Sequence, residues 1–202
     1  MLHVITGGSG SGKSAYAENW LLEQRKKNLY DENNENTNPS APLYIATMIP
    51  YGKEGETKVT RHKRLRAGKG FRTFECYRDL AKADIPVNTG ILLECMSNLM
   101  ANELYDEAGN MNKPEKVKRQ ILEGIQHVMG KTDLFVIVTN EVQGDQMEYS
   151  EETKIYQRVL GEVNQSLAGL AEKVTEVVYG TPVERKSLKQ LWNSFKIAFA
   201  MY

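Results

Sequence analysis

The chain has 202 residues, of which 41% are hydrophobic and 26% charged, and this length and composition predict one globular domain with a sizeable core. Lys plus Arg and Asp plus Glu number 26 each, and the zero net charge argues against wholesale coating of nucleic acid. No apolar run reaches the roughly 20 residues of a membrane span, and no secretory signal is apparent. Cys76 and Cys95 fit neither a disulfide framework nor a zinc site. We therefore expect a cytoplasmic protein with reduced thiols.

The N-terminal segment has the order strand, glycine-rich turn, helix. Residues 2–6 form a short apolar run that predicts a buried strand, and helix-forming residues extend from Lys13 to Lys27. This order opens a nucleotide-binding α/β domain. Residues 28–42 contain five asparagines and two prolines and predict a loop. Residues 43–47 then predict a second strand.

The middle of the chain begins with a strongly basic segment. Residues 58–72 contain seven Lys or Arg and no acidic residue, and we expect a helix that breaks at Gly68 and Gly70. Residues 90–95 predict an apolar strand with Glu94 at its carboxyl end, followed by a helix to about Tyr105. A turn over 109–114 precedes a helix over 115–129 whose apolar residues recur at helical spacing.

The C-terminal half repeats the alternation. Residues 134–139 predict a strand, 151–174 a long helix and 176–179 a final strand. Apolar strands that alternate with helices predict a mainly parallel sheet covered on both faces. We assign this domain to 1–186 and a tail to 187–202, where Leu188, Leu191, Trp192, Phe195 and Phe199 form one helical stripe. The stripe predicts docking on the domain itself or on a neighbouring subunit, rather than on a membrane surface.

Residues 7–14, Gly-Gly-Ser-Gly-Ser-Gly-Lys-Ser, satisfy the pattern G-x-x-x-x-G-K-[ST]. The glycines let several backbone N–H groups point at one polyphosphate, and the following helix adds its positive end. Lys13 is expected to reach the β- and γ-phosphates, and the Ser14 hydroxyl to ligate Mg²⁺. The alternative is a glycine-rich turn that matches by chance, which the setting between a strand and a helix disfavours.

A phosphate loop also needs a second carboxylate near the end of a neighbouring strand to hold the hydrated metal. Glu94 fits this position because an apolar strand leads into it. The alternative is a surface glutamate at the end of a strand.

His62 differs from His3 and His127 in its surroundings, because Arg61, Lys63, Arg64 and Arg66 flank it. Nearby cations disfavour the imidazolium, so we expect a lowered pKa and a neutral ring, which a nucleophile needs. The same cations would neutralise a triphosphate. The alternative is a solvated basic helix face with an incidental histidine or a passive phosphate patch. His3 and His127 are expected to be packed or solvated residues without a catalytic role.

In the phosphate loop, the basic segment around His62 and the strand that ends in Glu94, the chain resembles the bifunctional adenosylcobinamide kinase / adenosylcobinamide-phosphate guanylyltransferase family of the CobU/CobP type. The resemblance spans residues 1 to about 186, with departures at Gly10, where the family usually has arginine, and at Gln143, where it usually has glycine. The matching blocks are residues 7–14, 43–47, 61–63, 72–75, 92–95 with Asn102, 138–142 and 163–178.

The resemblance implies a RecA-like P-loop fold, a three-layer sandwich, and a homotrimer. It implies phosphorylation of the aminopropanol hydroxyl of adenosylcobinamide by ATP or GTP, and then transfer of GMP from GTP through a guanylylated His62. The nucleotide contacts that it implies are Gly7, Gly8, Ser9, Gly10, Ser11, Gly12, Lys13, Ser14, Ala46, Thr47, Met48, Lys63, Arg64, Leu65, Arg66, Glu75 and Glu94.

Three other functions stay open on sequence alone. One is a P-loop kinase that keeps the phosphorylation step alone, and another is a non-catalytic GTP-binding regulatory protein. An RNA-binding module would depend on residues 58–72 by themselves, and the neutral overall charge and the lack of interleaved aromatic residues disfavour it.

Overall fold

The computed structural model describes residues 1–29, 41–88, 90–141 and 149–187. Most of the loop predicted over 28–42, the position of Gln143 and the helical stripe of the tail lie outside these residues. No helix within these ranges is long and apolar enough to cross a bilayer. Cys76 and Cys95 are both buried, and neither forms a disulfide.

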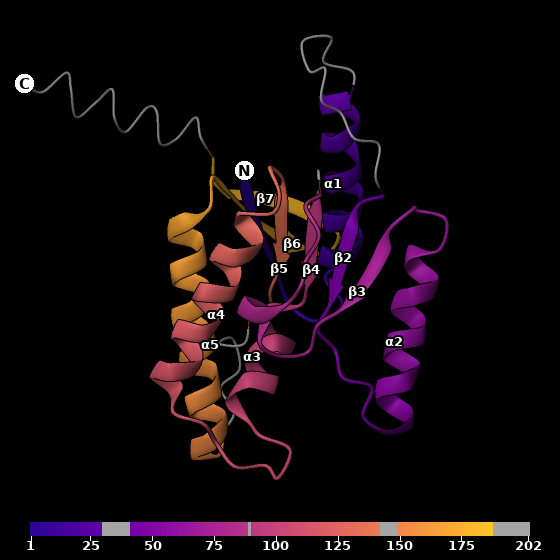
Figure 1. Cartoon of the computed structure of the whole chain (residues 1–202). Helices are drawn as coiled ribbons and strands as arrows, with labels where there is room; N and C mark the ends of the chain where they lie inside the picture. Colours follow the sequence, from indigo (N-terminus) through magenta and orange to yellow (C-terminus); the bar gives the residue numbers. More distant parts are fainter. Residues whose placement is uncertain (30–40, 89, 142–148, 188–202) are drawn as a thin grey trace, which may run out of the picture.

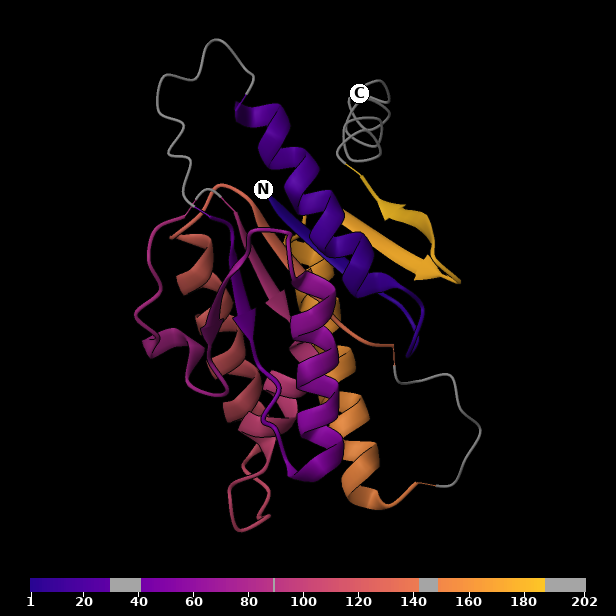
Figure 2. The ribbon, with the colours of Figure 1, turned by 90° about the vertical axis from the view of Figure 1, so that its right-hand side faces the viewer.

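The described chain folds into one sheet with helices around it (Figures 1 and 2). The helices are α1 (Lys13–Leu29), α2 (Gly52–Arg66), the short 3₁₀ helix η1 (Leu80–Lys82), α3 (Met96–Leu104), α4 (Pro114–Met129) and α5 (Glu151–Leu170). The strands are β1 (Leu2–Thr6), β2 (Leu43–Ala46), β3 (Arg72–Glu75), β4 (Ile91–Glu94), β5 (Phe135–Val138), β6 (Lys173–Val178) and β7 (Thr181–Lys186).

The sheet has the order β3-β2-β4-β5-β1-β6-β7. Every neighbouring pair is parallel except the β6–β7 hairpin. One strand, β5, therefore stands between the strand that leads into the phosphate loop and the strand that ends in Glu94. This is the RecA-like arrangement, and it confirms the predicted α/β fold with a mainly parallel sheet. Because β1 to β5 run in one direction, the segments that follow them gather along the same edge of the sheet.

Two apolar clusters cover the two faces of the sheet. Side chains of α3, α4, α5 and η1 pack with one face of the strands, and α1 packs on the other face through Ala17, Trp20 and Leu21. Figure 1 shows these layers on opposite sides of the strands. The α2 helix belongs to neither layer, since among its side chains that the structure describes Arg66 alone is buried. This leaves α2 to line a cavity rather than the core.

Several predicted boundaries were wrong. The α2 helix begins at Gly52, six residues before the basic segment, and β3 was not predicted as a strand because its side chains are largely exposed at the edge of the sheet. The last helix ends at Leu170 and not at 174, because residues from Lys173 pair with β1 as β6. Strand β6 is not the final strand, since the chain turns at Tyr179 and returns as β7.

His3 is fully buried in β1, as a packed residue should be. Its Nε2 lies 2.8 Å from the Thr175 hydroxyl oxygen, and its ring packs edge-on against Trp20. Burial, and after it the charge of Lys173, lowers the pKa of His3 from 6.5 to about 3. The folded protein therefore holds a neutral ring under conditions where the unfolded chain binds a proton.

The depressed pKa predicts how stability depends on pH. The contribution of His3 is fully present above pH 6.5 and is lost as the pH falls from 6.5 towards 3, at up to about 1.4 kcal/mol per pH unit. Between pH 7.5 and pH 5 we expect His3 to remove about 2 kcal/mol from the free energy of unfolding. The His3→Gln variant should lack this component in urea titrations at the two pH values. An equally steep loss in the variant would contradict the assignment.

Candidate functional site

The phosphate loop is the backbone between β1 and α1, and the structure explains why it begins with glycine. Gly7 has a φ of +152°, which L side chains rarely adopt, and a Cβ there would lie 2.5 Å from the carbonyl oxygen of Val177. The amide of Ser11 donates to the carbonyl of Gly8 at 3.2 Å, and the amide of Gly180 in the β6–β7 turn donates to the carbonyl of Ser11 at 2.8 Å. The loop is thus shaped by its own turn and supported by the hairpin.

The first turn of α1 supplies two polar side chains to this loop. Lys13 is 8% exposed, and its ammonium donates to the carbonyl oxygen of Gly8 at 3.0 Å. Burial lowers the pKa of Lys13, and the negative charge of Glu94 opposes that shift. The Ser14 hydroxyl donates to a carboxylate oxygen of Glu94. Lys13 and Ser14 therefore both lie where the phosphate loop meets the end of β4.

Glu94 is a buried carboxylate and not the surface glutamate of the alternative interpretation. Its burial raises its pKa, while the Ser14 hydrogen bond and the Lys13 charge act in the opposite direction. Its second oxygen, Oε2, is buried and has no hydrogen-bond partner among the described residues. Such an oxygen beside a serine hydroxyl suits Mg²⁺, which takes oxygen ligands and retains several waters. Ser14 and Glu94 would hold the ion, and its charge would keep Glu94 ionised.

His62 reaches the same place from α2. Its Nδ1 lies 3.8 Å from Oε1 of Glu94, and its side chain is 30% exposed. The pKa of His62 is lowered first by burial and then by the charge of Arg66. The predicted direction of the shift is therefore confirmed, although burial and not the neighbouring cations is the larger cause. A neutral imidazole next to the phosphate loop can act as a nucleophile at neutral pH.

Charged side chains hold α2 in this position. The Arg66 guanidinium lies 3.5 Å above the centre of the Tyr44 ring on β2, and its Nη2 donates to the Thr73 hydroxyl at 3.3 Å. Just beyond the helix, Lys69 Nζ lies 2.6 Å from the buried carboxylate of Glu18 on α1. Arg66 is one helical turn after His62, so its contact with Tyr44 also sets where the imidazole lies.

These groups line one cavity of about 490 Å³ at the carboxyl edge of the sheet. The sequence-predicted residues on its wall are Ser9, Gly10, Ser11, Gly12, Lys13, Ser14, Ala46, Met48, His62, Lys63, Leu65, Arg66, Glu75 and Glu94. Four predicted contacts do not line it. Gly7 is buried and Gly8 exposed in the phosphate loop, Thr47 is fully buried and donates to the carbonyl of Cys95 at 2.8 Å, and Arg64 is exposed on α2.

Further wall residues were not predicted as nucleotide contacts, although Arg61 was among the cations expected to neutralise a triphosphate. They are Ala15, Tyr44, Lys58, Val59, Arg61, Tyr77, Cys95, Asn98 and Asn140. Asn140 follows β5, which lies beside the phosphate-loop strand β1, and Tyr44 is on β2, which is separated from β1 by β4 and β5; the sequence shows neither position, because the strand order exists only in the folded sheet. A polar residue at the end of an apolar strand predicts a position on the cavity wall, and this pattern was used for Glu94 but not for Asn140.

A phosphate loop on a RecA-like sheet, with a buried lysine and a carboxylate placed for a metal, defines a P-loop nucleotide-binding protein. A family model described as cobinamide kinase / cobinamide phosphate guanyltransferase matches residues 3–185. The chain belongs to this family, and the protein is a transferase of cobalamin biosynthesis.

Two curated proteins are similar to the chain over their whole length. The bifunctional adenosylcobalamin biosynthesis protein CobU of Salmonella typhimurium is 31% identical over 198 residues, covering 92% of this chain and 100% of that protein. The protein of the same name from Escherichia coli is 30% identical over 197 residues, with the same coverage. Among solved structures, the flagellar accessory protein FlaH from Methanocaldococcus jannaschii has a TM-score of 0.44 and 14% identity, covering 92% of this chain and 78% of that one.

Proposed function

We propose that this protein phosphorylates adenosylcobinamide with ATP or GTP and then transfers GMP from GTP to the new phosphate through a guanylylated His62, giving adenosylcobinamide-GDP. The observation that carries this proposal is the meeting of Lys13, His62 and Glu94 in one cavity. A kinase alone needs the lysine and the carboxylate, whereas a neutral histidine beside them supports a second, covalent step. Membership of the family supports the same two activities.

In the kinase step the chain mainly positions and neutralises the triphosphate. The hydroxyl oxygen of the substrate bonds to the γ-phosphorus as the bond to the β–γ bridging oxygen breaks, and the hydroxyl proton passes to solvent. The loop amides hold the phosphates, and Lys13 places its charge next to the group being transferred. When bound between Ser14 and Glu94, Mg²⁺ would neutralise charge on the phosphate oxygens.

In the transfer step His62 is the proposed nucleophile. Since Nδ1 is the ring nitrogen that faces Glu94, we assign the attack on the α-phosphorus to Nε2. An N–P bond forms as the bond to pyrophosphate breaks. A phosphate oxygen of adenosylcobinamide phosphate then displaces the histidine, which leaves as neutral imidazole and closes the diphosphate linkage. The intermediate divides one difficult displacement into two easier ones.

The family resemblance also supports a homotrimer with the corrinoid as a small-molecule partner, and the composition and the two cysteines support a location in the cytoplasm. Light scattering of the purified protein and fractionation of its host cells would test these two properties.

One incubation tests the proposed function. The protein is mixed with adenosylcobinamide, GTP and Mg²⁺, and the corrinoid products are identified by their masses. We expect adenosylcobinamide phosphate first and adenosylcobinamide-GDP later. A reaction that stops at the phosphate would instead favour the kinase-only function. Binding of GTP without either product would favour the non-catalytic GTP-binding protein.

A further inference from the structure

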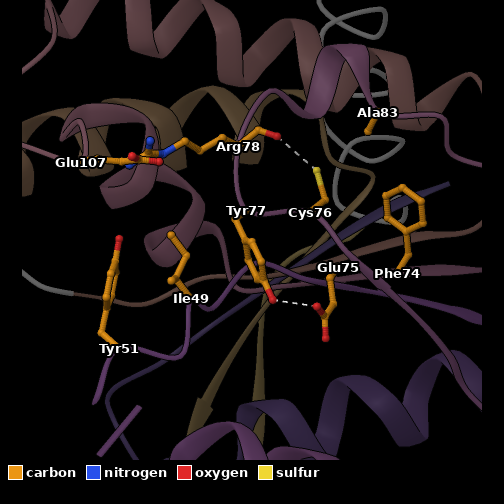
Figure 3. Close-up of a pocket in the computed structure, with 9 residues that line it drawn as sticks. All are labelled: Ile49, Tyr51, Phe74, Glu75, Cys76, Tyr77, Arg78, Ala83 and Glu107. Atoms are coloured by element: carbon orange, nitrogen blue, oxygen red, sulfur yellow. Dashed lines mark hydrogen bonds between the residues drawn. The ribbon is translucent and has the colours of Figure 1, made fainter. Parts of the chain in front are cut away.

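A second hollow opens beside the nucleotide cavity, and the two share a wall. The hollow has a volume of about 580 Å³, and its other walls include Ile49, Tyr51, Phe74, Arg78 and Ala83 (Figure 3). Glu75 and Tyr77 line both spaces. The Tyr77 hydroxyl donates to Oε2 of Glu75 at 2.8 Å, so the shared wall is a single hydrogen-bonded pair.

The hollow lies on the edge of the sheet where a second substrate is needed. Most of its residues come from the carboxyl end of β3 and from the segments that follow β2 and β3, and Glu107 comes from the segment after α3. The phosphate loop and Glu94 lie at the ends of other strands along the same edge. In α/β sheets ligands bind outside the carboxyl ends of the strands. A molecule in the hollow therefore needs to extend only past Glu75 and Tyr77 to reach a phosphoryl group held at the loop.

The walls of the hollow are held in place from α3. The Asn102 amide donates to the carbonyls of both Thr47 and Tyr77, at 2.8 and 2.9 Å, and so joins the segments that follow β2 and β3. Arg78 donates from Nη2 to the carbonyl of Tyr105 at 2.9 Å. The hollow is thus built before a ligand binds, which lowers the entropic cost of binding.

The chemistry of the hollow suits a flat ring system that carries amides. The rings of Tyr51, Phe74 and Tyr77 supply apolar faces, and Tyr51 is 67% exposed. Figure 3 shows Arg78 and Glu107 at one end of the hollow, where they offer a donor and an acceptor. The Nε of Arg78 is buried and has no hydrogen-bond partner among the described residues, and its Nη2 is fixed by the carbonyl of Tyr105.

We propose that this hollow binds one edge of the corrin ring of the acceptor alcohol, with the aminopropanol arm passing over Glu75 and Tyr77 to the phosphate loop. The assignment rests on the proposed function, because it takes the acceptor from it. A rival hollow of about 650 Å³ shares Lys63, Arg66 and Glu75 with the nucleotide cavity, but from there it extends past Ala67 and Gly68 to Phe71 and Thr73, towards the amino end of β3. It therefore leads away from the edge that holds the phosphate loop.

Filling each hollow in turn tests the proposal. Ala83→Trp occupies the proposed corrin site, and Ala67→Trp is the matched control in the rival hollow. Two readouts are compared: the KM for adenosylcobinamide in phosphorylation, and the rate at which the protein takes covalent label from α-labelled GTP, which needs no acceptor. We expect Ala83→Trp to raise the KM for adenosylcobinamide at least about tenfold and to leave the labelling rate unchanged. Ala67→Trp should change neither.

A milder pair of variants covers the case in which Ala83→Trp does not fold. Tyr51→Ala should raise the KM for adenosylcobinamide severalfold, and Tyr51→Phe should retain the wild-type value, since the ring and not the hydroxyl provides the stacking surface. An unchanged KM in Ala83→Trp and Tyr51→Ala, or an equal rise in Ala67→Trp, overturns the corrin site while the proposed function stands. A wild-type protein that forms neither corrinoid product overturns both.

Discussion

Replacing His62 by alanine is expected to abolish covalent labelling of the protein by α-labelled GTP and the formation of adenosylcobinamide-GDP. The rate of GMP transfer should fall at least about 10³-fold, because the variant lacks the atom that forms the bond to phosphorus. Phosphorylation of adenosylcobinamide should continue, so adenosylcobinamide phosphate should accumulate. Acid-labile radioactivity on the denatured protein and mass analysis of the corrinoid products measure the two effects.

The control for this substitution is His127→Ala. His127 lies on α4, outside the nucleotide cavity, and its Nε2 is 2.9 Å from the carbonyl oxygen of Ala83. The control should take up label as the wild type does. Label retained by His62→Ala would contradict the covalent route through this residue and direct attention to another nucleophile on the cavity wall.

Replacing Lys13 by methionine should impair both reactions, in contrast to His62→Ala. Methionine retains much of the apolar stem but removes the one charge that the first turn of α1 places next to the phosphate loop. We expect kcat for phosphorylation to fall by roughly 10²- to 10³-fold, the cost of removing one group that stabilises charge in the transition state. Covalent labelling of His62 should fall as well, since both steps use a triphosphate held by the same loop. Initial rates of the two reactions measure the effect.

Lys27→Ala provides a matched change on the same helix. Lys27 is exposed in the last turn of α1, far along the helix from the phosphate loop. Its removal should leave both rates close to those of the wild type. A Lys13→Met variant that loses one activity alone would show that the two steps use the triphosphate in different positions, which contradicts a single shared cavity.

The phosphate loop shows how much of a site can be contained in a short segment. Residues 7–14 contain the glycines, the lysine and the serine of the motif in one continuous segment. The spacing of apolar residues predicts the strand before this segment and the helix after it. The class of fold followed from the same local signals, since apolar strands alternate with helices. By contrast, the exposed edge strands β3 and β7 were missed, because their pairing partners and not their own patterns make them strands.

The sequence by itself therefore determined the phosphate loop, the basic segment around His62 and a parallel α/β architecture, because each depends on neighbours within a few residues. Only the tertiary structure decided that Glu94 is buried against Ser14, that Arg66 on Tyr44 holds His62 over the loop, and that the segments after β2 and β3 enclose a second hollow. These relations join residues that are 22 to 80 positions apart in the chain. The order of the strands in the sheet brings these residues together in space, and that order results from burial of the whole sheet between its two layers of helices.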